Sequence, residues 1–149
     1  MILQVARIEV APNRSKLSWL KEDLLYFIED PYSETNLPAK PIEFPEILNT
    51  GQLIGLLYTI EGSTLGGQVI SKNLYRIHNL TATQGARYFN GYGNNTVIFW
   101  DEFCQFVESI QHHDEQCQLA AAFTIITFKL FDRVLTDYYR THIFMEGCL

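Results

Sequence analysis

The chain has 149 residues, enough for one domain with its own core, and 47% of them are hydrophobic while 19% are charged. A net charge of −6 and the lack of any Lys/Arg cluster exclude nucleic acid as the main partner, because phosphate binding requires grouped basic side chains. The longest uncharged run, residues 47–60, is too short to span a bilayer, and no signal peptide is recognisable at the N-terminus.

The three cysteines, Cys104, Cys117 and Cys148, are far apart and form no CxxC pair. This spacing predicts neither a zinc site nor a disulfide framework. Isolated cysteines are typical of a reducing compartment. We therefore expect a single cytoplasmic domain over residues 1–149, with no membrane segment.

The first predicted element is a helix over residues 14–28, where Leu17, Leu20, Leu24, Phe27 and Ile28 recur at helical spacing. Four prolines follow within residues 31–45 and predict an extended connection. A long helix is expected over residues 46–78, with a bend near Gly62 because this segment holds five glycines.

The turn residues of segment 79–95 predict a loop. Two further apolar periodicities predict helices over residues 96–111 and 115–139. No strand pattern appears, so the predicted fold class is all-α.

The segment EGSTLGG, residues 61–67, is the strongest anomaly of the chain, because each glycine inside a helix costs roughly 1 kcal/mol relative to alanine. Gly62 and Gly66 are four residues apart and share a face, Gly67 widens that strip, and Ser63 borders it. Bare backbone of this kind admits close approach. Either a second helix packs across the strip or a flat ligand lies on it, and spacing does not decide between them.

Several stretches resemble the bacterial, biliverdin-forming heme oxygenases. The glycine segment GLLYTIEGSTLGGQVISKNL (55–74) is similar to the distal helix of that family. Further similar stretches are RSKLSWLKEDL (14–24), RYFNGYG (87–93), FWDEF (99–103) and AAAFTIITFKLFDRVL (120–135), in the same order and at the same spacing.

The resemblance implies an all-α domain that holds heme between a proximal helix, which supplies a His ligand to the iron, and the glycine-rich distal helix. The heme-contacting residues would be Gly62, Ser63, Gly66 and Gly67, with the Tyr58 hydroxyl as a further polar group. Ser63 would be the polar group on the distal side. Electrons would come from an external donor, a ferredoxin or a reductase.

The iron ligand is where this sequence departs from the family, whose proximal His lies well upstream of the stretch that matches residues 14–24. The chain begins at Met1 and has no histidine before His78, so we expect an N-terminally shortened domain without the proximal helix. Of His78, His112, His113 and His142, the last is our candidate for a replacement ligand, because a C-terminal tail can fold back or reach a second subunit.

Charge is a second departure. Heme propionates require cationic or hydroxyl partners. Asp101 stands where family members often carry a basic residue, and Lys129 and Arg133 are the cations that could substitute for it.

Three hypotheses follow. The chain could be a heme oxygenase with a substitute ligand, or a non-catalytic remnant of the fold that dimerises through uncovered apolar faces or binds a tetrapyrrole weakly. It could also be a truncated form of an ordinary heme oxygenase. A homodimer is expected under the second hypothesis, since loss of a helix would expose apolar surface.

Overall fold

The structure is a computed structural model that describes residues 14–28, 43–110 and 114–142; of residues 141 and 142 it describes only the backbone. Within these ranges every regular element is a helix, and the β-pairing is limited to isolated bridges at Thr81. The all-α prediction is confirmed. Most of the proline-rich connection, His112, His113 and Cys148 lie outside the described residues.

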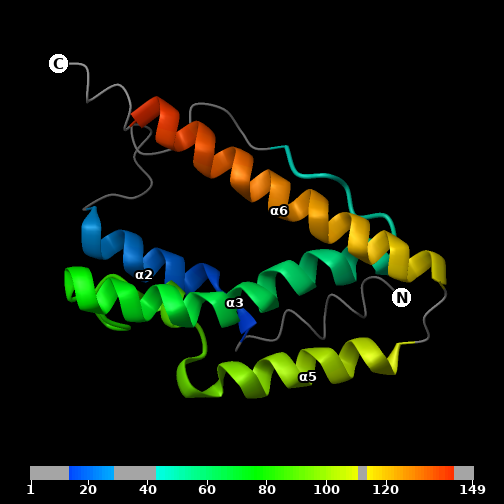
Figure 1. Cartoon of the computed structure of the whole chain (residues 1–149), viewed down its shortest axis with the longest axis horizontal. Coiled ribbons are helices and arrows are strands. Elements are labelled where there is room, and N and C mark those ends of the chain that lie inside the picture. The colour runs from blue at the N-terminus through cyan, green and yellow to red at the C-terminus, as the bar shows by residue number, and fades with distance from the viewer. Residues whose placement is uncertain (1–13, 29–42, 111–113, 143–149) are drawn as a thin grey trace. The chain divides into compact units, whose positions relative to one another are not determined.

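The described residues divide into two compact units, which share one long helix, α3 (Thr50–His78). The first unit contains residues 14–28 and 60–110, and the second contains residues 43–59 and 114–142. In Figure 1, α3 is the helix coloured from teal to green. Its helical residues run without a break from Thr50 to His78, and the bend expected near Gly62 stays a prediction.

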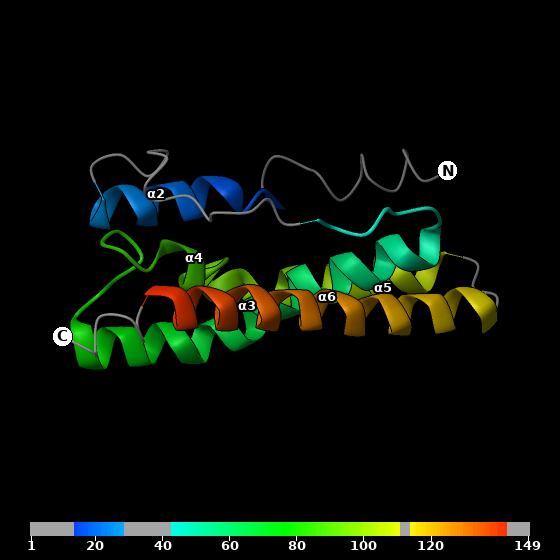
Figure 2. The same cartoon turned by 90° about the horizontal axis from the view of Figure 1, so that it is seen from above.

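The first unit contains α2 (Leu17–Phe27), the second half of α3, α4 (Arg87–Asn90), the 3₁₀ turn η3 (Gly93–Asn95) and α5 (Thr96–Ser109). The sequence predicted a loop where α4 and η3 lie. The short helix α4 forms because the Asp23 carboxylate, on α2, accepts hydrogen bonds from the backbone N–H groups of Arg87 and Tyr88, each at 2.7 Å. A side chain from another helix therefore caps α4, which lies between α2 and α3 in Figure 2.

The start of α3 is set by a local cap. The Asn49 side chain accepts a hydrogen bond from the backbone N–H of Gln52 at 2.9 Å, and the Gln52 side chain accepts one from the N–H of Leu48 at 2.7 Å. Asparagine is among the preferred residues before a first helical turn. The helix accordingly begins at Thr50, four residues after the predicted start.

In the second unit, α6 (Asp114–His142) packs directly against the first turns of α3. A Cβ atom at Gly55 would lie 2.3 Å from the backbone oxygen of Ala120, and one at Gly51 would lie 2.5 Å from that of Gln116. The Thr124 hydroxyl donates to the carbonyl of Gly55 at 3.1 Å. These two glycines therefore serve backbone-to-backbone helix packing, which is one of the uses that the sequence suggested for bare backbone.

Candidate functional site

The second half of α3 is amphipathic in the opposite sense to an ordinary surface helix. Glu61 and Thr64 are buried and Gln68 is half-buried, and their spacing places these three polar residues on one face. Ser63, Gly66 and Ile70 lie on the other side of the helix and are exposed, with Ile70 at 44%. We call the first set the anchoring face and the second the open face. Between Glu61 and Ile70, then, α3 buries its polar side and presents small and apolar residues to solvent.

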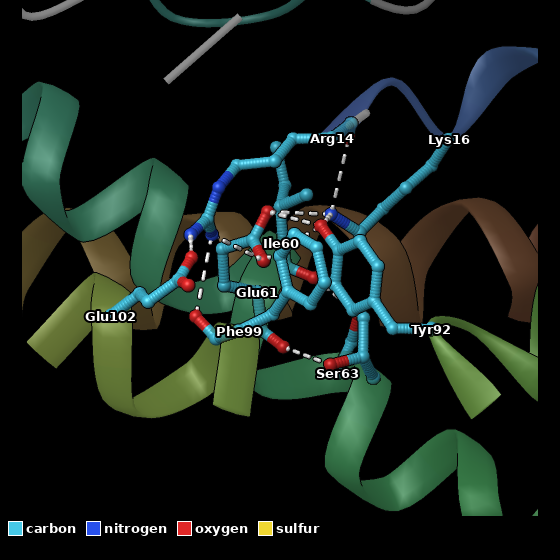
Figure 3. Close-up of polar contacts among 9 residues, drawn as sticks. Arg14, Lys16, Ile60, Glu61, Ser63, Tyr92, Phe99 and Glu102 are labelled. Atoms are coloured by element: carbon cyan, nitrogen blue, oxygen red, sulfur yellow. Dashed lines mark hydrogen bonds and ion pairs between the residues drawn. The ribbon is translucent and has the colours of Figure 1, made fainter. Parts of the chain in front are cut away.

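Glu61 is the centre of the anchoring face and is only 3% exposed. Its carboxylate accepts hydrogen bonds from Lys16 at 2.5 Å, from Arg14 at 3.3 Å and from the Tyr92 hydroxyl at 3.0 Å. Figure 3 shows the two cations reaching Glu61 from the segment that precedes α2. Two buried cations and a hydroxyl therefore compensate a buried carboxylate, as such a group requires.

The second cation, Arg14, is itself shared. Its guanidinium also donates to the Glu102 carboxylate at 2.9 Å and to the backbone oxygen of Phe99 at 3.4 Å, both on α5. Glu61, Arg14, Lys16, Tyr92 and Glu102 thus form one connected set, which we call the Glu61 cluster. The cluster joins α3, α5 and the residues before α2.

Aromatic rings cover the Glu61 cluster. The rings of Tyr92 and Phe99 stack at 4.1 Å, and Trp19 meets Tyr92 edge-on at 5.2 Å. The charged groups of Arg14 and Lys16 lie 5.1 Å from the ring centres of Phe99 and Tyr92, respectively. These rings exclude water from the ion pairs while interacting favourably with both cations.

Gln68 extends the anchoring face by two turns. Its side-chain amide donates to the backbone oxygens of Asn90 and Gly93 at 3.0 and 3.3 Å, and to the Thr96 hydroxyl at 3.0 Å. Thr64, between Glu61 and Gln68, packs against Gly91. From Glu61 to Gln68, one side of α3 is therefore fixed to α4, η3 and the start of α5.

The three glycines of EGSTLGG have three different surroundings. A Cβ at Gly67 would lie 2.9 Å from the backbone oxygen of Phe89, so Gly67 admits α4. A Cβ at Gly62 would lie 3.4 Å from the Trp100 ring, whereas one at Gly66 would meet nothing within 4 Å. The backbone at Gly66 is thus the part of the strip that an external molecule can approach.

The other predicted contact residues are accounted for as follows. The Ser63 hydroxyl is exposed and donates to the backbone oxygen of Ile60 at 2.8 Å. Tyr58 lies one turn before Gly62, in the part of α3 that belongs to the second unit, and is 47% exposed. Asp101 is exposed on α5, and Lys129 and Arg133 are exposed on α6.

No assembled metal site is present in the part of the chain that the structure describes, where no three His, Cys, Asp or Glu side chains converge. His78 is exposed at the last residue of α3. His142 is the last residue of α6, and its side chain is outside the description.

A cavity of about 400 Å³ lies on the anchoring side, lined by Trp19, Arg87, Tyr92 and Phe99 together with Ser and Asn side chains. None of the open-face residues lines this cavity. Its aromatic residues are those that cover the Glu61 cluster, so we assign the cavity to that packing.

The Glu61 cluster and Gln68 were not among the functional residues predicted from the sequence. Their signal was the spacing Glu61–Thr64–Gln68, a polar stripe inside an otherwise apolar helix. Such a stripe is read most simply as a solvated face. Only the fold brings Arg14 and Lys16 to it.

The fold and the site together define an all-helical protein whose glycine-bearing helix presents an apolar face to solvent, and none of the described helices is long and apolar enough to cross a membrane. The family model for heme oxygenase matches residues 4–137. The chain therefore belongs to the heme oxygenase family, which implies heme as its ligand and supports a heme-oxygenase-like function in general. No curated protein and no solved structure matches the chain.

Proposed function

We propose that the open face of α3 binds heme and that the protein, in the cytoplasm, takes part in the oxidative opening of heme to biliverdin. The observation that supports this most directly is the inversion of α3. A helix that turns Ser63, Gly66 and Ile70 to solvent, while it buries Glu61 and Thr64, has an apolar surface suited to a flat apolar ring. Exposed apolar patches of this kind mark ligand sites.

Gly66 is the residue that gives the face its specificity for a flat ligand. With nothing within 4 Å of the position of a Cβ, the ring of a porphyrin can reach van der Waals contact with the backbone. Ile70 supplies apolar contact one turn further along α3, and the lone pairs of the Ser63 hydroxyl can accept a hydrogen bond from a water molecule at the border of the ring. Gly67 acts indirectly, since its bare backbone admits α4, whereas a Cβ at Gly62 would make only ordinary contact with the Trp100 ring.

The chemistry would come from the ligand and the orientation from the protein. Bound heme would supply both the iron and the ring that is oxidised, with dioxygen as oxidant and electrons from a ferredoxin or a reductase. The role of this chain is to orient the ring and to exclude water from one side of it. His142 is the candidate iron ligand. The ligand-field spectrum of the heme complex is compared between His142→Ala and the control variant His78→Ala.

The test is a titration of the purified protein with hemin, followed by its Soret absorbance. We expect a saturating, stoichiometric band for the unchanged protein and a loss of affinity of at least about tenfold for Gly66→Leu, since a bulky side chain would separate ring and backbone. Tyr75→Leu is the matched control, because Tyr75 is 61% exposed and lies about 180° from Gly66 around the helix. It should change the affinity less than about twofold.

A broad, non-saturating band for the unchanged protein would exclude heme binding by this chain, and equal effects of the two substitutions would exclude the open face as its site. Where heme binds, reductant and dioxygen are added, and the appearance of bilin absorbance decides whether binding leads to ring opening.

A second function, dimerisation without catalysis, has its own support on α6. Large apolar side chains that are 50–67% exposed recur along this helix at a spacing typical of helix pairing; they are Ile125, Phe128, Phe131, Leu135, Tyr138 and Tyr139. A second copy of the chain is the occupant that we propose for this stripe.

A further inference from the structure

The Glu61 cluster has a geometric relation to the open face. Each residue turns an α-helix by about 100°, so Glu61 lies roughly 160° from Ser63 and 140° from Gly66 around the axis of α3. A group that holds Glu61 in place therefore also determines the direction in which Gly66 faces.

Rotation of α3 about its axis would separate the buried charges of the Glu61 cluster. The side chains of Glu61, Arg14 and Lys16 are 4%, 10% and 9% exposed. Turning α3 by a single residue position would carry the Glu61 carboxylate away and leave both cations beneath the aromatic rings without it. A buried charge that loses its partner is strongly unfavourable, even where the intact pair adds little to stability.

We infer that Glu61 is a positioning residue: with Arg14, Lys16 and Tyr92 it fixes the rotation of α3 and so directs the Ser63–Gly66–Ile70 face to the ligand. The identity of that ligand rests on the proposed function, but the rotational role does not. A polar anchor selects one arrangement among several apolar ones of similar energy, as a single buried polar residue fixes the register of paired helices.

Thiol accessibility at two adjacent positions reports the rotation directly. In a background with Cys104, Cys117 and Cys148 replaced by Ser, one protein carries Ser63→Cys and another Thr64→Cys. Ser63 is exposed and Thr64 is 7% exposed, so the first thiol should be alkylated far faster than the second. The ratio of the two rates measures how strictly α3 keeps its open face outward.

Glu61→Gln should lower this ratio at least about tenfold, because the neutral amide no longer holds both cations. Two control variants separate rotation from general loosening. Phe103→Leu, in the core of the same unit, destabilises without removing a hydrogen-bond partner of Glu61, and Glu102→Gln removes only the exposed partner of Arg14. Both should keep the ratio within about twofold of the starting protein.

An unchanged ratio in Glu61→Gln, or an equal fall in Glu61→Gln and in Phe103→Leu at matched loss of melting temperature, would overturn the inference. Should Glu61→Gln not fold, Lys16→Met replaces it. A fall of about threefold in the ratio of alkylation rates supports the positioning role of the cluster, and an unchanged ratio refutes it. Where heme binds, the isomer composition of the bilin should broaden in Glu61→Gln and stay as in the starting protein in Glu102→Gln. Failure of heme binding would count against the proposed function alone, since the thiol ratio needs no heme.

Discussion

Gly66 and Gly67 are adjacent in α3 but have opposite surroundings. Gly66 faces open space, whereas a Cβ at Gly67 would lie 2.9 Å from a backbone oxygen that cannot move independently. Their similarity in sequence therefore conceals two different roles, one toward a ligand and one toward the fold.

Alanine at these two positions gives a matched pair of predictions. Gly66→Ala should raise the free energy of unfolding by about 1 kcal/mol, because alanine is the better helix former and meets no atom. Gly67→Ala should lower it by roughly 1–3 kcal/mol, because α4 must shift. Thermal unfolding of the two proteins checks both signs, and equal shifts would contradict these assignments.

Cysteine reactivity is a second property at the residue scale. Burial raises the pKa of the Cys104 thiol, and the negative charges of Asp101 and Glu108 raise it further. Cys117 is exposed. Since the thiolate is the reactive form, Cys104 should hold its proton to higher pH and react more slowly.

We predict that in a Cys148→Ser background Cys104 is alkylated at least about fivefold more slowly than Cys117 at pH 8, with a rate profile displaced to higher pH. The raised pKa of Cys104 also makes folding stability depend on pH. The folded state holds the thiol proton more tightly than the unfolded chain does. The stabilising contribution of Cys104 is therefore fully present below the ordinary thiol pKa and is lost as the pH rises through the raised pKa. Single-cysteine variants, compared over pH 7 to 10, measure the alkylation rate and the free energy of unfolding as functions of pH. Coincident rate profiles of Cys104 and Cys117 would refute the prediction.

At the scale of elements, the close packing of α6 on α3 depends on Gly55. Its position leaves no room for a Cβ next to the Ala120 backbone oxygen, 2.3 Å away. The Thr124 hydroxyl, which bonds both the Gly55 and the Ala120 carbonyls, fills the remaining space.

We expect Gly55→Ala to separate the two helices and to lower the free energy of unfolding by roughly 2–3 kcal/mol, despite the higher helix propensity of alanine. Chemical denaturation measures the change. Ser63→Ala, at an exposed position of the same helix, is the control. It should change the free energy of unfolding by less than about 0.5 kcal/mol.

The helices themselves could be predicted, since α2, α3, α5 and α6 bury faces whose residues recur at helical spacing within one segment. The short helix α4 could not be predicted, because it is capped by a distant residue. The Asp23 carboxylate, which accepts the hydrogen bond of the Arg87 N–H, lies 64 residues earlier in the chain. The same limit applies to the site. The glycine face is a local pattern, but Arg14 and Lys16 reach Glu61 across 47 and 45 residues.

At the scale of the whole molecule, the apolar stripe of α6 and the distribution of charge bear on assembly. Asp114 and Glu115 occupy the first turn of α6, and Arg140 lies near its end. An antiparallel pair of α6 helices would bring these opposite charges together and place Phe128 near the two-fold axis. The stripe has six side chains, four of them aromatic, and at about half exposure each supplies about 100 Å² of surface or slightly less, so together they come near the roughly 800 Å² per partner of a standard interface.

Sedimentation should accordingly give twice the 17.2 kDa chain mass at micromolar concentration. Phe128→Asp should yield the monomer, because it places a charge in the centre of the stripe. Ala122→Asp, which adds the same charge at an exposed position of α6 off the stripe, should leave the dimer intact. A monomeric starting protein, or equal behaviour of the two variants, would refute pairing through α6.

The burial of the Glu61 cluster also has a consequence for how the protein responds to its medium. Dissolved ions screen charges that they can approach, and at 0.15 M salt the interaction of two exposed charges is largely screened beyond about 8 Å. The Glu102 carboxylate, 56% exposed, is open to such screening, whereas the pairs of Glu61 lie beneath stacked rings. The outward direction of Gly66 should therefore be the same in dilute buffer and in molar salt, so a cell whose ionic strength varies widely would keep an unchanged ligand surface.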